Sequence, residues 1–201
     1  SSDLPAEPSE MIRAENLSKS FVGRVLFDQL SFSLNSRERL GLVGRNGHGK
    51  TTLFRLITGE EQPDSGAIII PKGYRIGHVR QTIEFTRESI VAEAVSALPP
   101  HARDQVWKAE KILAGLGFAK KDMARPPAEF SGGYQVRLNL AKALVSEPDL
   151  LLLDEPTNFL DITSIRWVER FLVAWPRELM VITHDRSFMD RRSEEHTSEL
   201  Q

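Results

Sequence analysis

The sequence contains no cysteine, which excludes a disulfide framework and any metal site built on thiolates. No apolar run approaches the about 20 residues that a membrane-spanning helix needs. Charges nearly cancel, with 26 Lys and Arg against 28 Asp and Glu, so the whole chain lacks the basic excess typical of nucleic-acid binding. The polar start SSDLPAEPSE lacks the apolar segment of a signal peptide. These absences predict a soluble globular protein with a cytoplasmic location.

The remaining sequence alternates between short and long apolar patterns. Residues 1–10, with two prolines among small and acidic residues, indicate a flexible leader. Beyond them, short runs predict strands and longer amphipathic runs predict helices. The predicted strands are MIRAENL (11–17), VLFDQLSFSL (25–34), RLGLV (39–43), GAIIIP (66–71), YRIGHV (74–79), LLLLD (150–154) and LMVIT (179–183). The predicted helices are KTTLFRLITG (50–59), ESIVAEAVSAL (88–98), RDQVWKAEKILAGLG (103–117), YQVRLNLAKALVSE (134–147) and ITSIRWVERFLVAW (162–175).

The order of these runs predicts the fold class. LLLLD (150–154) is apolar until its final carboxylate, which is typical of a central parallel strand covered on both faces. Helical runs, interrupted by Pro99-Pro100, occupy residues of about 82–139 between two groups of strands. We therefore expect one α/β domain, in which helices flank a parallel sheet and an α-helical subdomain is inserted.

GRNGHGKT (44–51) matches the G-x-x-x-x-G-K-[ST] pattern of a phosphate-binding loop, after a predicted strand and before a predicted helix. Its glycines let backbone N–H groups converge on an anion at the positive end of a helix. Lys50 adds a charge for the β- and γ-phosphates, and the Thr51 hydroxyl can bind Mg²⁺. The alternative is an ordinary strand-to-helix turn. The predicted nucleotide-binding residues are Gly44, Arg45, Asn46, Gly47, His48, Gly49, Lys50, Thr51 and Thr52.

Asp154 and Glu155 follow the buried run LLLL, at the strand end where open α/β sheets place their ligands. Two adjacent carboxylates there can divide the work of phosphoryl transfer. Asp154 would hold Mg²⁺, and Glu155 would orient and polarise the water that attacks the γ-phosphate. Two solvated acids at a strand end are the alternative, which the nearby phosphate loop disfavours.

FSGGYQ (130–135), read alone, is a helix start with a serine cap. Together with the preceding motifs it makes residues 11–191 resemble the ATP-binding cassette (ABC) ATPases, whose signature is usually LSGGQ. The resemblance implies a P-loop NTPase core, an N-terminal antiparallel β-subdomain, and ATP and Mg²⁺ as cofactors. It also implies that Ser131, Gly132 and Gly133 close on ATP held by a second ABC domain, so that two domains enclose two nucleotides.

The resemblance implies further roles. Phe21 in LSKSFVG is similar to the aromatic residue that stacks on adenine, although a core phenylalanine is the alternative. Gln81 in GHVRQ resembles the glutamine that contacts Mg²⁺ and the attacking water, and His184 in ITHD resembles the switch histidine at the γ-phosphate. NFLD (158–161) resembles the D-loop. The predicted catalytic residues are Glu155, His184 and Gln81, and the predicted Mg²⁺ ligands are Thr51, Gln81 and Asp154.

Two motifs separate the function classes. EPTNFLD (155–161) differs from the EPTSALD common in transporter ATPases, and THDRSFMD (183–190) is unusual after a transporter switch histidine. Both resemble the ABC-F proteins, which are tandem ATPases of the cytoplasm that bind ribosomes and act in translation or antibiotic protection. The ATP-binding subunit of a membrane transporter is the alternative function.

Two features depart from the ABC-F pattern. Only 49 residues separate Gln81 from Ser131, so the charged helical arm that the resemblance implies there is short or missing, and ribosomal RNA contact rests on the resemblance alone. After Arg191 the pattern stops, and residues 192–201 back-translate into AGATCGGAAGAGCACACGTCTGAACTCCAG, which resembles a sequencing-adapter oligonucleotide. We therefore expect a C-terminally incomplete ABC domain followed by an adapter-derived tail, rather than a natural hydrophilic C-terminus.

Such a chain is expected to bind ATP but to hydrolyse it poorly, because no second signature motif completes the site. The other possibility is an inert fragment, if missing strands leave apolar sheet edges exposed.

Overall fold

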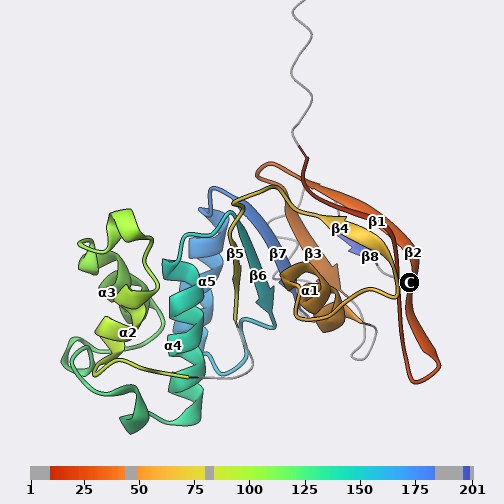
Figure 1. Cartoon of the computed structure of the whole chain (residues 1–201). Helices are drawn as coiled ribbons and strands as arrows, with labels where there is room; N and C mark the ends of the chain where they lie inside the picture. Colours follow the sequence, from red (N-terminus) through yellow and green to blue (C-terminus); the bar gives the residue numbers. More distant parts are fainter. Residues whose placement is uncertain (1–9, 44–48, 80–83, 184–196, 200–201) are drawn as a thin grey trace, which may run out of the picture.

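The computed structural model describes residues 10–43, 49–79, 84–183 and 197–199, which form two β-sheets with helices packed against them (Figure 1). The strands are β1 (Glu10–Phe21), β2 (Arg24–Asn35), β3 (Arg39–Val43), β4 (Ser65–Ile69), β5 (Ile76–His78), β6 (Leu150–Asp154), β7 (Glu178–Ile182) and β8 (Thr197–Glu199). The α-helices are α1 (Lys50–Thr58), α2 (Ile90–Ser96), α3 (Val106–Gly115), α4 (Gly132–Val145) and α5 (Ile162–Val173). Short 3₁₀ turns are η1 (Pro100–Ala102), η2 (Lys120–Asp122) and η3 (Pro127–Glu129).

The smaller sheet is antiparallel, in the order β2-β1-β4, and forms the predicted N-terminal β-subdomain. The chain reverses between β1 and β2 at Val22 and Gly23, both with positive φ. β4 approaches β1 so closely that a Cβ on Gly66 would lie 2.3 Å from the carbonyl oxygen of Asn16. Only glycine therefore fits this position.

The larger sheet is parallel, in the order β5-β6-β7-β3-β8. β6 and β7 lie inside it, and their buried side chains alternate between two apolar clusters. Leu151, Leu153 and Val181 face the helices α2–α5, whereas Leu152 and Met180 join α1 and the antiparallel sheet. This alternation confirms the prediction of a central parallel strand covered on both faces.

α2 and α3 pack on α4 and make up the predicted helical subdomain, at the left of Figure 1. The predicted break at Pro99-Pro100 is confirmed, since α2 ends at Ser96 and η1 begins at Pro100. Within residues 84–131, the longest helix of the described chain is α3, with 10 residues. This is consistent with a short or missing arm. The subdomain boundary expected near residue 139 falls inside α4, which runs to Val145.

α3 and α5 touch at Gly115. A Cβ at this position would lie 2.0 Å from the indole of Trp167, so the glycine provides the space into which the ring packs. Trp167 stacks on Phe171 with 5.1 Å between ring centroids, and Phe171 packs on Trp175. The contact between Trp167 and Gly115 therefore joins α3 of the helical subdomain to α5.

A buried carboxylate joins the helical subdomain to the segment before it. Glu93 of α2 is 1% exposed, accepts hydrogen bonds from the backbone N–H groups of Thr86 and Arg87, and pairs with Lys142 of α4. Burial acts to raise the pKa of Glu93, but the bonds from Lys142 and the two N–H groups outweigh it and the pKa is lowered. Glu93 is therefore held as an anion.

Lys142→Met is expected to lower the free energy of unfolding by about 3–5 kcal/mol, because it leaves a buried anion without its cation. Urea unfolding followed by circular dichroism measures the loss. The double variant Glu93→Gln/Lys142→Met removes the charge from both sides and should lose less. Lys111→Met, at an exposed position of α3, is the matched control and is expected to have a free energy of unfolding within about 0.5 kcal/mol of the wild type. An equal loss in single and double variants would contradict this role of Glu93.

The sequence predicted a flexible leader at residues 1–10 and an adapter-derived tail at residues 192–201. Residues 1–9 of the expected leader lie outside the described residues, and residue 10 already begins β1. Within the expected tail, β8 pairs in parallel with β3. Because this pairing says nothing about the origin of the tail, that origin stays a prediction. No helix of the described chain is long and apolar enough to cross a bilayer.

Candidate functional site

Three strand ends meet at one edge of the parallel sheet. β7 lies between β3 and β6, and its residue Ile182 pairs with Leu42 on one side and Asp154 on the other. The chain leaves β3 toward the phosphate loop and leaves β7 toward residue 184. The register therefore places the end of β3, the Asp154–Glu155 pair and Thr183, which precedes the predicted switch histidine, at the same edge.

Thr51 and Asp154, two of the predicted Mg²⁺ ligands, are in contact although 103 positions separate them. The Thr51 hydroxyl donates a hydrogen bond of 2.7 Å to Oδ2 of Asp154. A hydroxyl and a carboxylate oxygen are hard oxygen ligands of the kind that Mg²⁺ prefers beside phosphate. The donor set thus fits the metal that the fold implies.

Gly49 connects the phosphate loop to α1. Its φ is 85°, and a Cβ here would lie 2.9 Å from Cζ of Phe27 in β2. Lys50 follows as the first residue of α1 and is only 6% exposed, and Thr51 and Thr52 are half-buried. The predicted loop residues Gly44, Arg45, Asn46, Gly47 and His48 lie outside the described residues.

Phe21 is exposed at the end of β1. Its side chain is 42% exposed, so the alternative of a core phenylalanine is wrong. Two residues earlier, Lys19 pairs across the hairpin with Phe27, whose ring packs against Gly49. Because a strand rises about 3.4 Å per residue, Phe21 lies only two residues along β1 from the position opposite Phe27. Phe21 is therefore close to Gly49 at the end of the phosphate loop. The position agrees with the predicted adenine contact without testing it.

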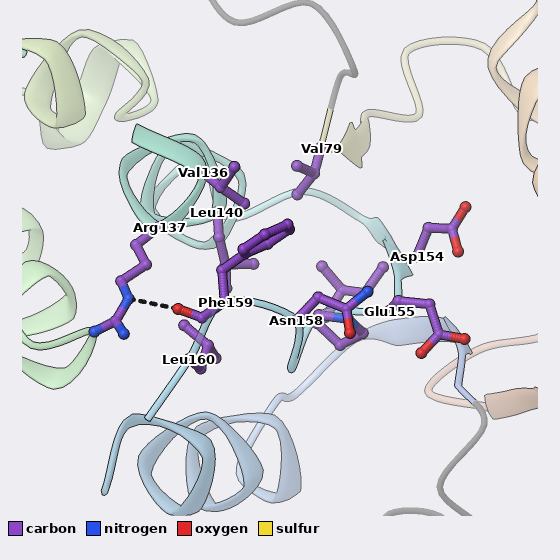
Figure 2. Close-up of a pocket in the computed structure, with 11 residues that line it drawn as sticks. Val79, Val136, Arg137, Leu140, Asp154, Glu155, Asn158, Phe159 and Leu160 are labelled. Atoms are coloured by element: carbon purple, nitrogen blue, oxygen red, sulfur yellow. Dashed lines mark hydrogen bonds between the residues drawn. The ribbon is translucent and has the colours of Figure 1, made fainter. Parts of the chain in front are cut away.

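Glu155 lies beside Asp154 in a left-handed conformation. Its φ is 48°, and its backbone N–H donates to the carbonyl oxygen of Ile182 at 2.9 Å. A non-glycine residue with positive φ is strained, and such strain occurs often at functional sites. The turn directs the chain away from the sheet directly after β6. Figure 2 shows both carboxylates at one end of a cavity of about 130 Å³, with Phe159 and Leu160 farther along it.

The Ser131-Gly132-Gly133 turn begins α4. Ser131 occupies the N-cap position, but its side chain makes no capping hydrogen bond, so it does not act as the serine cap of the simpler interpretation. Ser131 and Gly132 are exposed. α4 and α1 pack on opposite faces of the parallel sheet (Figure 1).

Arg137, which the sequence did not single out, joins the signature helix to the D-loop. The guanidinium is 8% exposed and donates to the carbonyl oxygen of Phe159 at 2.9 Å (Figure 2), to that of Leu116 at 3.1 Å, and to Oδ2 of Asp161 at 2.9 Å. Asp161 also caps α5 by accepting from the N–H of Ser164. These hydrogen bonds lower the pKa of Asp161 from 3.8 to about 2, and the bond from the Ser164 N–H has the largest effect, followed by the bond from Arg137. The only sequence signal for Arg137 is a cation on the apolar face of a predicted helix.

Two predicted catalytic residues, Gln81 and His184, lie outside the described residues. The described chain therefore brings together Gly49, Lys50, Thr51, Thr52, Asp154 and Glu155 at one edge of the parallel sheet, whereas Phe21 lies on β1 of the antiparallel sheet. The roles of Gln81 and His184 stay predictions.

Known proteins show the same pattern in sequence and structure. The ABC transporter family profile matches residues 27–158. The human ATP-binding cassette sub-family F member 3 is 36% identical over 89% of this chain, the Arabidopsis thaliana ABC transporter F family member 2 is 33% identical over 91%, and the probable ATP-binding protein YheS of Haemophilus influenzae is 34% identical over 90%. The chain spans 30%, 34% and 33% of their respective lengths, about a third in each.

Solved structures agree on the fold. A bacterial ABC transporter cassette, described as dimeric, matches with a TM-score of 0.72 at 21% identity, over 89% of this chain and 90% of its own. The ATP-binding subunit of an ABC transporter matches with a TM-score of 0.74 at 21% identity, over 92% and 83%. The predicted fold class is thus confirmed. With the family profile covering most of the described site and two of these relatives named as subfamily F members, the chain belongs to the ATP-binding cassette family.

Proposed function

We propose that this chain is an ATP-binding and ATP-hydrolysing cassette of the ABC-F type. The observation that carries the proposal is the 2.7 Å contact between Thr51 and Asp154, directly beside Glu155 at the edge where β3, β6 and β7 end. In this proposal the metal site and the general base lie next to Lys50, the first residue of the helix that follows the phosphate loop. Those are the parts that phosphoryl transfer to water requires.

The residues divide the work as follows. Phe21 stacks on adenine, and the loop from Gly44 to Thr52 surrounds the phosphates, with Lys50 supplying positive charge. Thr51, Asp154 and Gln81 hold Mg²⁺, which neutralises charge on the phosphate oxygens when bound. Glu155 orients the attacking water and withdraws its proton, and His184 contacts the γ-phosphate. Positioning and charge stabilisation account for most of catalysis in this class of reaction.

A second cassette completes each site in this proposal. The Ser131 hydroxyl makes no capping hydrogen bond, and Ser131 and Gly132 are exposed at the start of α4. α4 packs on the face of the parallel sheet opposite α1. Exposed Phe159 lies beside this turn, since a Cβ on Gly133 would be 3.9 Å from the Cβ of Phe159. Such a surface supports closure of Ser131, Gly132 and Gly133 over nucleotide held by another domain. The natural protein would be longer than residues 11–191 and carry that domain after a linker.

We further propose that the whole protein acts on the ribosome in the cytoplasm, in translation or in antibiotic protection. The support is the subfamily F name of two relatives that are 33% and 36% identical to this chain over 91% and 89% of it. The short helices α2 and α3 leave little arm for RNA contact, so other surfaces would provide it.

Sequencing the source gene past the codon of Arg191 tests this proposal first. The expected result is a reading frame that runs through a linker into a second cassette, with RSEEHTSELQ absent. The full-length product should then sediment with ribosomes in the presence of ATP. A single domain next to a gene for a membrane protein would instead support the ATP-binding subunit of a transporter.

A further inference from the structure

Lys19 is a nearly buried cation at the end of β1 that the function proposed above does not use. Its side chain is 8% exposed, and Nζ donates to Oε1 of Glu61 at 2.9 Å and to the carbonyl oxygen of Gln62 at 2.8 Å. Oδ1 of Asp64 lies 3.5 Å away. The hydrogen bond to Glu61 outweighs burial and raises the pKa of Lys19. The ammonium is therefore charged and fixed in place.

The end of β1 makes a second set of hydrogen bonds, between Ser20 and Asp64. Oδ2 of Asp64 accepts hydrogen bonds from the N–H of Ser20 at 2.7 Å and from its hydroxyl at 2.9 Å. Asp64 and Glu61 belong to the connection between α1 and β4, directly after the helix that begins at the phosphate loop. The end of β1 is thus fastened to the element that carries Lys50 and Thr51.

The fixed ammonium lies over an aromatic ring. Nζ of Lys19 is 4.8 Å from the ring centroid of Phe21, within the range of a cation–π interaction. The ring nevertheless stays 42% exposed. A partly exposed aromatic side chain at a strand end is therefore supported by a cation while part of its surface remains open to a ligand.

We propose that Lys19 is a positioning residue for the nucleobase: it holds the Phe21 ring in the orientation on which adenine stacks. This inference rests on the proposed ATP binding and adds a residue to the base site. A cation on a ring draws electron density toward itself, so the rest of the ring stacks better on an electron-rich base such as adenine. Lys19 acts through Phe21 and does not touch the nucleotide.

The test separates the base from the phosphates. Binding of ATP and of tripolyphosphate, which lacks the base, is measured by titration calorimetry on the full 201-residue chain. Lys19→Met is expected to weaken ATP binding about three- to tenfold, the range that one cation–π contact supplies. Tripolyphosphate binding should change less than about twofold. Lys19→Arg, which keeps a cation, should restore most of the ATP affinity.

Two further variants exclude a general loss of structure. Glu61→Gln keeps Lys19 but removes the nearer of its two anionic partners, and should give a smaller, base-dependent loss. In a Phe21→Leu background, Lys19→Met should have almost no further effect on ATP binding, because the ring through which it acts is gone. Lys72→Met, an exposed lysine between β4 and β5, is the matched control and should bind both ligands as the wild type does.

The outcomes are distinct. If the wild-type chain binds neither ligand, the proposed function is wrong and the role of Lys19 falls with it. If the wild type binds both, but Lys19→Met weakens both equally or neither, only the role of Lys19 is overturned. The same holds if Lys19→Met weakens ATP binding equally in the Phe21→Leu background.

Discussion

Glu155→Gln is expected to lower ATP turnover by about 10²–10⁴-fold, the contribution typical of a positioned general base. The amide keeps the shape of the side chain but cannot accept a proton from the attacking water. Nucleotide affinity should stay within about twofold of the wild type, because Lys50, Thr51 and Asp154 are unchanged. Phosphate release measures turnover, and calorimetry measures affinity, both at a concentration high enough to favour pairing of two chains.

The control for Glu155→Gln is Glu110→Gln, the same change at an exposed position of α3. It should leave both turnover and affinity as they are. Undiminished turnover in Glu155→Gln would remove Glu155 from the reaction. A parallel collapse of affinity would instead show that the substitution disturbed the strained turn after β6, where Glu155 has a φ of 48°.

Gly49→Ala is expected to weaken ATP binding at least about tenfold and to lower the free energy of unfolding by about 2–4 kcal/mol. Two costs combine. The alanine must adopt a φ of 85°, and its Cβ would lie 2.9 Å from Cζ of Phe27 and 3.3 Å from Cβ of Leu26. Relief of this clash shifts the residue directly before Lys50, and with it the backbone amides that are to meet phosphate.

Gly59 provides a matched control at the other end of α1. It also has a positive φ, 76°, but a Cβ there meets nothing within 4 Å. Gly59→Ala therefore carries only the conformational cost, about 1 kcal/mol, and should leave ATP affinity unchanged. Equal losses of affinity in both variants would mean that strain in α1, and not the contact with β2, controls the loop. Chemical unfolding and calorimetry decide between these results.

Much of the fold was predictable because each element has a strong local pattern. LLLLD and LMVIT lack polar residues until their ends, and β6 and β7 are indeed interior strands. Pro99-Pro100 and Gly59 predicted where α2 and α1 end, because proline is not tolerated inside a helix and glycine readily adopts the left-handed conformation that ends one. Sheet order was not predictable in the same way, since the position of β7 between β3 and β6 depends on contacts distant in sequence.

The candidate site was predictable where a motif is contiguous. Lys50, Thr51, Asp154 and Glu155 could be named because their spacing carries the chemistry. Arg137 and Lys19 could not, because their significance depends on partners far away, such as Asp161 and Glu61. Both are cations at positions where the sequence pattern otherwise places buried apolar side chains. Such a position is the one local sign that a cation has an anionic or carbonyl partner inside the protein.

The packing of Trp167 into the space at Gly115 has an optical consequence. All three tryptophans of the chain lie on one side of the molecule: Trp107 on α3, Trp167 on α5 and Trp175 just after it. None belongs to the antiparallel sheet or to α1. A change in intrinsic fluorescence on adding ATP would thus report movement of the helical subdomain against α5, and not direct quenching by the bound base.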